Sequence, residues 1–201
     1  DRVSAPSPRQ GVMRTAPYVQ GASVAPNAGK SIKLSSNESP LGPSPRAIEA
    51  YRGCSEQLFR YPDGAQTALR QAISEVFALE RNRLVCGNGS DQIIELTIRA
   101  YVTAQDEVIL SQYCFAMART HAQVQGAKLL TAPEADHRVD VDAIFALVSD
   151  RTRLVVIASP NNPCGTYLPR EELYRLHSGL PQAAILLIDA AYADYVVAPD
   201  Y

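Results

Sequence analysis

Short apolar runs alternate with helix-like segments between Leu84 and Asp189, and few folds accommodate this pattern. We expect strands at residues 84–86, 107–111, 128–131, 154–159 and 184–189, with helices between them at 90–102, 116–125, 141–148 and 169–179. Strands that alternate with helices in this way pair in parallel, because each helix returns the chain to the same edge of the sheet. The sequence therefore predicts an α/β protein with three layers, α/β/α, around a mostly parallel sheet.

The residues before this region have a different composition. Residues 1–32 are rich in Ser, Pro, Ala and Gly without sustained periodicity, which predicts an extended arm. Residues 34–45 contain three prolines and a glycine, which predicts an irregular loop. Ser44-Pro45 is a typical helix start, and we expect helices at 45–59 and 65–80.

Charge and cysteine content argue against several classes of function. A formal net charge of −2 provides no electrostatic basis for binding nucleic acid or an anionic membrane. No apolar run approaches the roughly 20 residues of a transmembrane helix, and no apolar segment follows the N-terminal arginines as in a secretory signal. Widely spaced cysteines predict reduced thiols, no metal site and a cytoplasmic protein. They are Cys54, Cys86, Cys114 and Cys164.

A glycine turn stands where the predicted strand at 84–86 meets the next helix. It reads Gly87-Asn88-Gly89-Ser90-Asp91, and a phosphate could bind the free N–H groups of the first helical turn. Two alternatives remain: Ser90 or Asp91 simply caps the helix, or the glycines bind a dinucleotide, although Gln92 stands where that fingerprint needs a third glycine.

Polar residues follow the last two predicted strands, at the edge where ligands bind in open α/β sheets. Asn162 comes after the strand at 154–159. Asp189 ends the strand at 184–189, and Tyr192 follows three residues later. Separately, they could be a turn asparagine, a capping aspartate and an exposed aromatic residue. Together they would suit pyridoxal phosphate, since a strand-end carboxylate without a nearby Lys or Arg can pair with a protonated pyridine nitrogen.

Three motifs resemble the fold-type I pyridoxal-phosphate aminotransferases: Gly-Ser-Asp at 89–91, Ser-Pro-Asn-Asn-Pro-Cys-Gly-Thr at 159–166 and Asp-Ala-Ala-Tyr at 189–192. The segment 33–45 and Arg-Tyr-Pro-Asp at 60–63 are similar to those of histidinol-phosphate aminotransferases in particular. The resemblance extends from about residue 16 to the end of the chain. It implies an N-terminal arm and substrate-lid loop at 1–45 and an incomplete large, cofactor-binding domain at 46–201.

The resemblance implies phosphate, partner and substrate contacts. Ser90 and Asp91 would bind the cofactor phosphate through their backbone N–H groups. Tyr61 would reach the phosphate bound in a neighbouring subunit, which implies a homodimer with shared active sites. Tyr18 and Asn37 would line the substrate pocket.

It also implies four contacts to the cofactor ring. Phe115 would stack on the pyridine ring, and Asp189 would pair with its nitrogen. Asn162 and Tyr192 would donate hydrogen bonds to the 3-hydroxyl oxygen. These residues would therefore hold the ring by its face and its polar edge.

The activity implied is transamination that interconverts L-histidinol phosphate with imidazole-acetol phosphate and 2-oxoglutarate with L-glutamate, in L-histidine biosynthesis. Ala118 and Ala190 replace a tyrosine and a glutamate that are common in the family. An aromatic-amino-acid aminotransferase or a threonine-phosphate-type decarboxylase therefore stays open. Outside the class, an NAD-dependent oxidoreductase or a non-catalytic scaffold domain remains an alternative.

The family's catalytic lysine has no counterpart among the lysines of this chain. They are Lys30, Lys33 and Lys128, and none follows the strand that ends at Asp189, where the family carries this residue. We expect the lysine beyond Tyr201, and the 201 residues by themselves are expected to be inactive.

Overall fold

The computed structural model describes residues 7–16, 32–33 and 35–201. The chain forms two compact units, Asp1–Thr15 with Val85–Tyr201 and Ala16–Leu84. The boundary predicted at residue 45 separates an arm and substrate-lid loop from a cofactor-binding domain. It divides the chain by function and stays a prediction.

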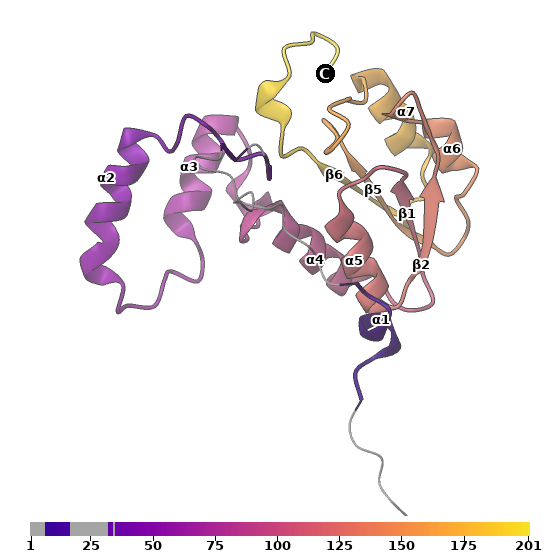
Figure 1. Ribbon diagram of the computed structural model, residues 1–201, viewed down its shortest axis with the longest axis horizontal. Coiled ribbons are helices and arrows are strands. Elements are labelled where there is room, and N and C mark those ends of the chain that lie inside the picture. The colour runs from indigo at the N-terminus through magenta and orange to yellow at the C-terminus, as the bar shows by residue number, and fades with distance from the viewer. Residues whose placement is uncertain (1–6, 17–31, 34) are drawn as a thin grey trace, which may run out of the picture. The chain divides into compact units, whose positions relative to one another are not determined.

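A parallel sheet of four strands forms the centre of the first unit. The strands lie in the order β2 (Lys128–Ala132), β1 (Glu107–Ser111), β5 (Thr152–Ala158) and β6 (Ile185–Asp189) (Figure 1). Each neighbouring pair is parallel. The chain thus leaves β1 for β2 on one side, then returns to β5 on the other side of β1. The predicted mostly parallel sheet is confirmed.

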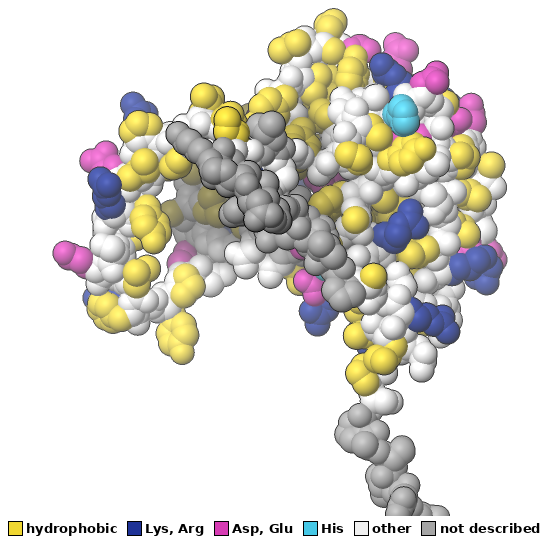
Figure 2. Space-filling model, viewed as in Figure 1, with side chains coloured by type: hydrophobic (Ala, Val, Ile, Leu, Met, Phe, Trp, Pro, Cys, Tyr) yellow, Lys and Arg dark blue, Asp and Glu magenta, His cyan; other side chains and the backbone are white. Residues whose placement is uncertain are grey.

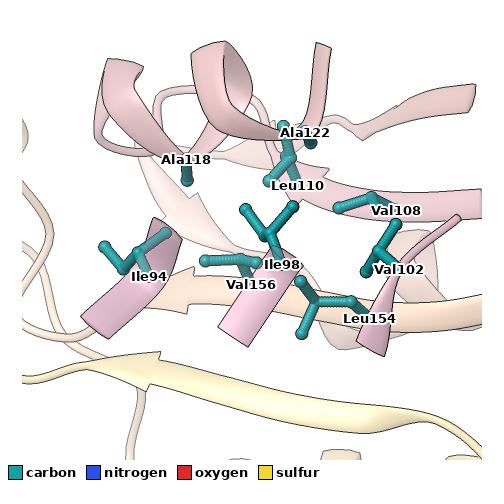
Figure 3. Close-up of a cluster of buried hydrophobic side chains, with 9 residues drawn as sticks. All are labelled: Ile94, Ile98, Val102, Val108, Leu110, Ala118, Ala122, Leu154 and Val156. Carbon is teal, nitrogen blue, oxygen red and sulfur yellow. The ribbon is translucent and has the colours of Figure 1, made fainter. Parts of the chain in front are cut away.

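Helices cover both faces of this sheet. Successive side chains of β1 and β5 point to opposite faces, so each strand contributes to two hydrophobic cores. On one face, α4 (Gly89–Tyr101) and α5 (Ala116–Gln125) pack over the strands. On the other, α6 (Val141–Phe145) and α7 (Arg170–Gly179) do the same. The α4–α5 core (Figure 3) contains Ile94, Ile98, Val102, Val108, Leu110, Ala118, Ala122, Leu154 and Val156. The predicted three-layer architecture is confirmed.

The N-terminal edge of the sheet contains a buried carboxylate. Glu107 opens β1 and is only 2% exposed. It accepts hydrogen bonds from Ser149 Oγ at 2.7 Å, Lys128 Nζ at 3.0 Å and an Arg151 guanidinium nitrogen at 2.7 Å. The hydrogen bonds from Ser149 and Lys128, with the positive charges of Arg151 and Lys128, hold the pKa of Glu107 below its ordinary value.

The second unit contains α2 (Pro45–Cys54), η1 (Ser55–Gln57), α3 (Thr67–Phe77) and η2 (Arg81–Arg83). Ser44 caps α2 by accepting a hydrogen bond from the Ala47 N–H at 3.1 Å, and Pro45 occupies the first turn, as predicted. None of its described residues is buried. Hydrophobic side chains accordingly lie over the surface of α2 and α3 (Figure 2).

Several predicted boundaries were wrong. Residues 84–86 form no strand in the described sheets, because no neighbouring strand offers them backbone partners. The helix predicted at 45–59 ends at Cys54 and continues as a 3₁₀ turn. The helix predicted at 65–80 is shorter because Gln66 and Ala78 adopt the left-handed conformation, and α6 ends at Phe145 instead of residue 148.

Four short elements of the first unit were not predicted. The helix α1 (Gln10–Met13) is followed by Arg14, whose carbonyl accepts a hydrogen bond from Gln123 of α5. An antiparallel pair, β3 (Glu134–Ala135) and β4 (Arg138–Val139), and the 3₁₀ turn η3 (Ala193–Tyr195) complete the unit. No helix in the described part of the chain has the length and apolar character needed to cross a membrane.

Candidate functional site

An open pocket lies beyond the C-terminal ends of β5 and β6. Its volume is about 340 Å³ with the solvent at its mouth included. The chain turns to opposite sides of the sheet after β1 and after β5, and this change of direction leaves a crevice where ligands bind in open α/β sheets. The lining residues are Ser90, Phe115, Ala158, Pro160, Asn162, Asp189, Ala191 and Tyr192.

Five of the seven predicted cofactor-binding residues meet in this pocket. Ser90 comes from the first turn of α4, and Phe115 directly precedes α5. Asn162 follows β5, Asp189 ends β6, and Tyr192 directly precedes η3. The fold therefore brings together side chains from five separate places in the sequence.

Asp189 is held at the end of β6 by its backbone. Its Cα pairs with Ala158 of β5, and the Ser159 N–H donates to its carbonyl oxygen at 3.0 Å. Its carboxylate accepts a hydrogen bond from the Ala191 N–H at 3.2 Å. Among the residues that the structure describes, no Lys or Arg forms an ion pair with it. The negative charge at the pocket therefore has no cationic partner within the described chain.

The loop after β5 is fixed by hydrogen bonds on both sides of Asn162. The Asn161 N–H donates to the Thr166 carbonyl and the Gly165 N–H donates to the Asn161 carbonyl, each at 2.7 Å. Gly165 has φ +74°, which a glycine adopts without strain. The Ser159 Oγ accepts from the Leu168 N–H at 3.0 Å. These bonds close a tight loop that presents Asn162 to the pocket.

The first turn of α4 is left without a side-chain cap. Asn88 is the N-cap residue and its side chain makes no capping bond, while its N–H donates to Gln92 Oε1 at 2.7 Å. Asp91 bonds elsewhere, with Oδ1 2.9 Å from His121 Nε2. Neither Ser90 nor Asp91 is the helix cap, so that alternative is wrong, and a helix start without a capping side chain can bind an anion.

The dinucleotide alternative also loses its structural support. That fingerprint requires a strand directly before the glycine turn. Residues 84–86 belong to neither described sheet, and β1, which follows α4, is the first strand of the main sheet in the chain.

The remaining predicted site residues do not line this pocket. The side chain of Asp91 is engaged with His121. Tyr61, whose side chain is fully exposed, and Asn37 belong to the second compact unit. Tyr18 lies outside the described residues. The roles of these four residues stay predictions.

Sequence reasoning missed three lining residues and one contact. Ala158, Pro160 and Ala191 adjoin the predicted strand ends, and that proximity was the available signal. The contact between His121 and Asp91 was not predicted, because no local pattern links two residues that lie 30 positions apart.

The thiol next to Phe115 is not an activated nucleophile. Burial raises the pKa of Cys114, so the thiol stays protonated near neutral pH. No group of three or more His, Cys, Asp or Glu side chains in the described part of the chain is arranged to bind a metal ion.

The donor set of the pocket fits one kind of ligand. It combines an aromatic ring, an amide, a phenol, a carboxylate without a cationic partner among the described residues, and a helix start without a capping side chain. A flat heteroaromatic group with a protonated nitrogen, a ring oxygen and an anionic substituent would satisfy all of them.

Comparison with known proteins agrees with this chemistry. The chain is 48% identical to the histidinol-phosphate aminotransferase of Rhodospirillum centenum over 199 residues, which cover 99% of this chain and 55% of that protein. It is 44% identical to the protein of the same name from Nitrobacter hamburgensis over 200 residues, again 99% and 55% of the two chains. The chain thus spans about half the length of these relatives.

A solved structure shares the fold. The histidinol-phosphate aminotransferase of Sinorhizobium meliloti, in complex with pyridoxal-5'-phosphate, superposes with a TM-score of 0.78 and 29% identity, over 82% of this chain and 45% of that one. The family model for aminotransferase class I and II matches residues 29–201. The chain therefore belongs to the class I and II aminotransferase family.

Proposed function

We propose that the protein is a pyridoxal-phosphate-dependent aminotransferase in L-histidine biosynthesis that transfers the amino group of L-glutamate to imidazole-acetol phosphate, giving 2-oxoglutarate and L-histidinol phosphate. Family membership supports the reaction class, and the names of the relatives support the substrate pair. No observation favours an aromatic-amino-acid aminotransferase, a decarboxylase or an oxidoreductase.

Asp189 is the observation that carries the proposal. A half-buried carboxylate without a cation among the described residues needs a positively charged partner. The protonated pyridine nitrogen of the cofactor would be that partner. Asp189 would in turn stabilise the protonated form of the ring nitrogen.

The other pocket residues would orient the ring. Phe115 would stack on its face, while Asn162 and Tyr192 would donate hydrogen bonds to its 3-hydroxyl oxygen. The N–H groups of Ser90 and Asp91 would bind the phosphate at the start of α4. When bound, pyridoxal phosphate supplies an electron sink for negative charge that develops at the substrate Cα.

The lysine for the proton transfer is proposed to lie in the half of the relatives' length that this chain does not span. Neither described lysine lines the pocket. Lys33 pairs with Glu38 in the second unit, and Lys128 pairs with Glu107 at the opposite edge of the sheet.

A cytoplasmic homodimer with shared sites completes the proposal. Tyr61 is fully exposed and would reach the phosphate bound by the partner subunit. Tyr51, Leu58 and Phe59, each at least 75% exposed, would be covered in such a dimer. Free cysteines are consistent with a reducing compartment.

The test uses the full-length protein. We expect titration with pyridoxal phosphate to produce a protein-bound absorbance band, and L-glutamate to be consumed with imidazole-acetol phosphate as acceptor. Phenylpyruvate as a competing acceptor tests the aromatic alternative. Absence of the band would refute the cofactor assignment, and faster turnover with phenylpyruvate would refute the substrate assignment.

A further inference from the structure

The acidic residue in the first turn of α4 makes its hydrogen bond to a neighbouring helix and not to the start of its own helix. Asp91 is the third residue of α4, and an acid at this position typically reaches back to the N–H of the N-cap residue. Here the Asn88 N–H donates to Gln92 Oε1 instead. The Asp91 carboxylate accepts a hydrogen bond from His121 on α5 at 2.9 Å.

This bond links two rigid elements of the first unit. His121 lies in the helical segment between Ala118 and Ala122, which pack into the same core as Ile94 and Ile98 of α4 (Figure 3). The His121 side chain is 15% exposed and that of Asp91 is 46% exposed. An ionised carboxylate can only accept hydrogen bonds, so Nε2 of His121 is the donor. The more buried imidazole therefore fixes the direction of the more exposed carboxylate.

We propose that His121 is a positioning residue that holds the Asp91 carboxylate away from the N-terminus of α4, so that the N–H groups there remain available to the cofactor phosphate. The inference rests on the proposed function, in which this helix start binds that phosphate. It adds a residue, His121, that does not line the pocket.

The physical reason is competition between two anions for one positive helix end. An unrestrained first-turn carboxylate is attracted to the same N–H groups and the same end of the helix dipole as a phosphate. Near the bound phosphate, its charge would also be repulsive. The hydrogen bond from His121 removes the competitor and disperses part of its charge.

A double-mutant cycle in the full-length protein tests this inference. The dissociation constants of pyridoxal phosphate and of pyridoxal, which lacks the phosphate, are measured by absorbance titration for wild type, His121→Ala, Asp91→Ala and the double variant. We expect His121→Ala to weaken binding of pyridoxal phosphate about tenfold and binding of pyridoxal by less than about twofold. In the Asp91→Ala background, the same change is expected to alter either constant by less than about twofold.

His177→Ala is the matched control, because His177 is exposed on α7 over the opposite face of the sheet. Should His121→Ala fail to fold, His121→Leu replaces it, since leucine occupies similar space without a hydrogen-bond donor. Equal losses for the two ligands, or a loss that persists in the Asp91→Ala background, would overturn the inference. Wild-type protein that binds neither ligand would contradict the proposed function itself, and the inference with it.

Discussion

Two carboxylates lie at opposite ends of the parallel strands of one sheet, and their surroundings differ. Glu107 begins β1, is 2% exposed, and accepts hydrogen bonds from Ser149, Lys128 and Arg151. Asp189 ends β6, is half-buried, and its carboxylate accepts a hydrogen bond from the Ala191 N–H. Among the described residues, two cations neutralise Glu107 and none pairs with Asp189.

The difference predicts a structural role for Glu107 and a role in ligand binding for Asp189. A buried carboxylate whose partners come from the protein stabilises the fold and has no charge left for a ligand. A carboxylate at a pocket without an internal cation is costly unless a ligand brings the missing charge. We therefore expect changes at Glu107 to affect stability, and changes at Asp189 to affect cofactor chemistry.

The largest expected effect is on turnover. Asp189→Asn in the full-length protein should lower kcat by about a hundredfold or more, because a preorganised charge at the reacting group is lost. The melting temperature should stay near that of wild type. Asp194→Asn, a change at an exposed position in η3, is the control measured in the same assay. Near-normal turnover by Asp189→Asn would contradict the role in cofactor chemistry that distinguishes Asp189 from Glu107.

Glu107→Gln should produce the opposite pattern. Loss of the hydrogen-bonded charge should lower the free energy of unfolding by about 2 kcal/mol, measured by urea denaturation. The dissociation constant for pyridoxal phosphate should not change. Glu171→Gln, at an exposed position in the first turn of α7, should alter stability by less than about 0.5 kcal/mol. A Glu107→Gln protein of wild-type stability would contradict the structural role.

A smaller effect is expected for Phe115, which is proposed to stack on the cofactor ring. Phe115→Ala should weaken pyridoxal phosphate binding by about tenfold, the scale of one aromatic contact. Tyr113→Ala, a change two residues earlier in the chain, is the control because Tyr113 does not line the pocket. If both substitutions weaken binding equally, the loss reflects the loop and not ring stacking.

The smallest expected effect is a pH dependence of stability. The folded-state pKa of Glu107 lies below its ordinary value of 4.5, so its contribution is present above pH 4.5 and is lost as the pH falls through the lowered pKa. Urea denaturation between pH 3 and pH 6 (roughly the range around this value) should show a steeper loss of stability for wild type than for Glu107→Gln. Parallel curves would remove Glu107 as a source of the acid sensitivity.

The central strands could be predicted because burial on both faces gives continuous apolar runs. β1 begins and ends at the predicted residues 107 and 111, and all of its residues are buried. The predicted strand at 84–86 failed for a physical reason, since an extended segment becomes a strand only when a neighbour pairs with it. The β3–β4 turn was missed because Asp136 and His137 take the left-handed conformation without a glycine to indicate it.

The pocket was predictable wherever a strand end marked its residues. Asn162 and Asp189 lie at the carboxyl ends of apolar runs, and that position identified them as candidate ligand-binding residues. The contact between Asp91 and His121 depends on how α4 and α5 pack, which no short spacing in the sequence encodes. Residues that act through packed helices are therefore the ones that sequence patterns leave out.

The absence of buried residues in the described part of the second unit has a consequence for amide hydrogen-exchange experiments. The sheet unit encloses its own cores, so its amide hydrogens should exchange with solvent only through large-scale opening. α2 and α3 enclose nothing, and their amides should exchange quickly whenever their apolar faces are uncovered. Slow exchange in these two helices would then indicate that subunits have assembled, whereas slow exchange in the sheet would indicate only that the first unit is folded.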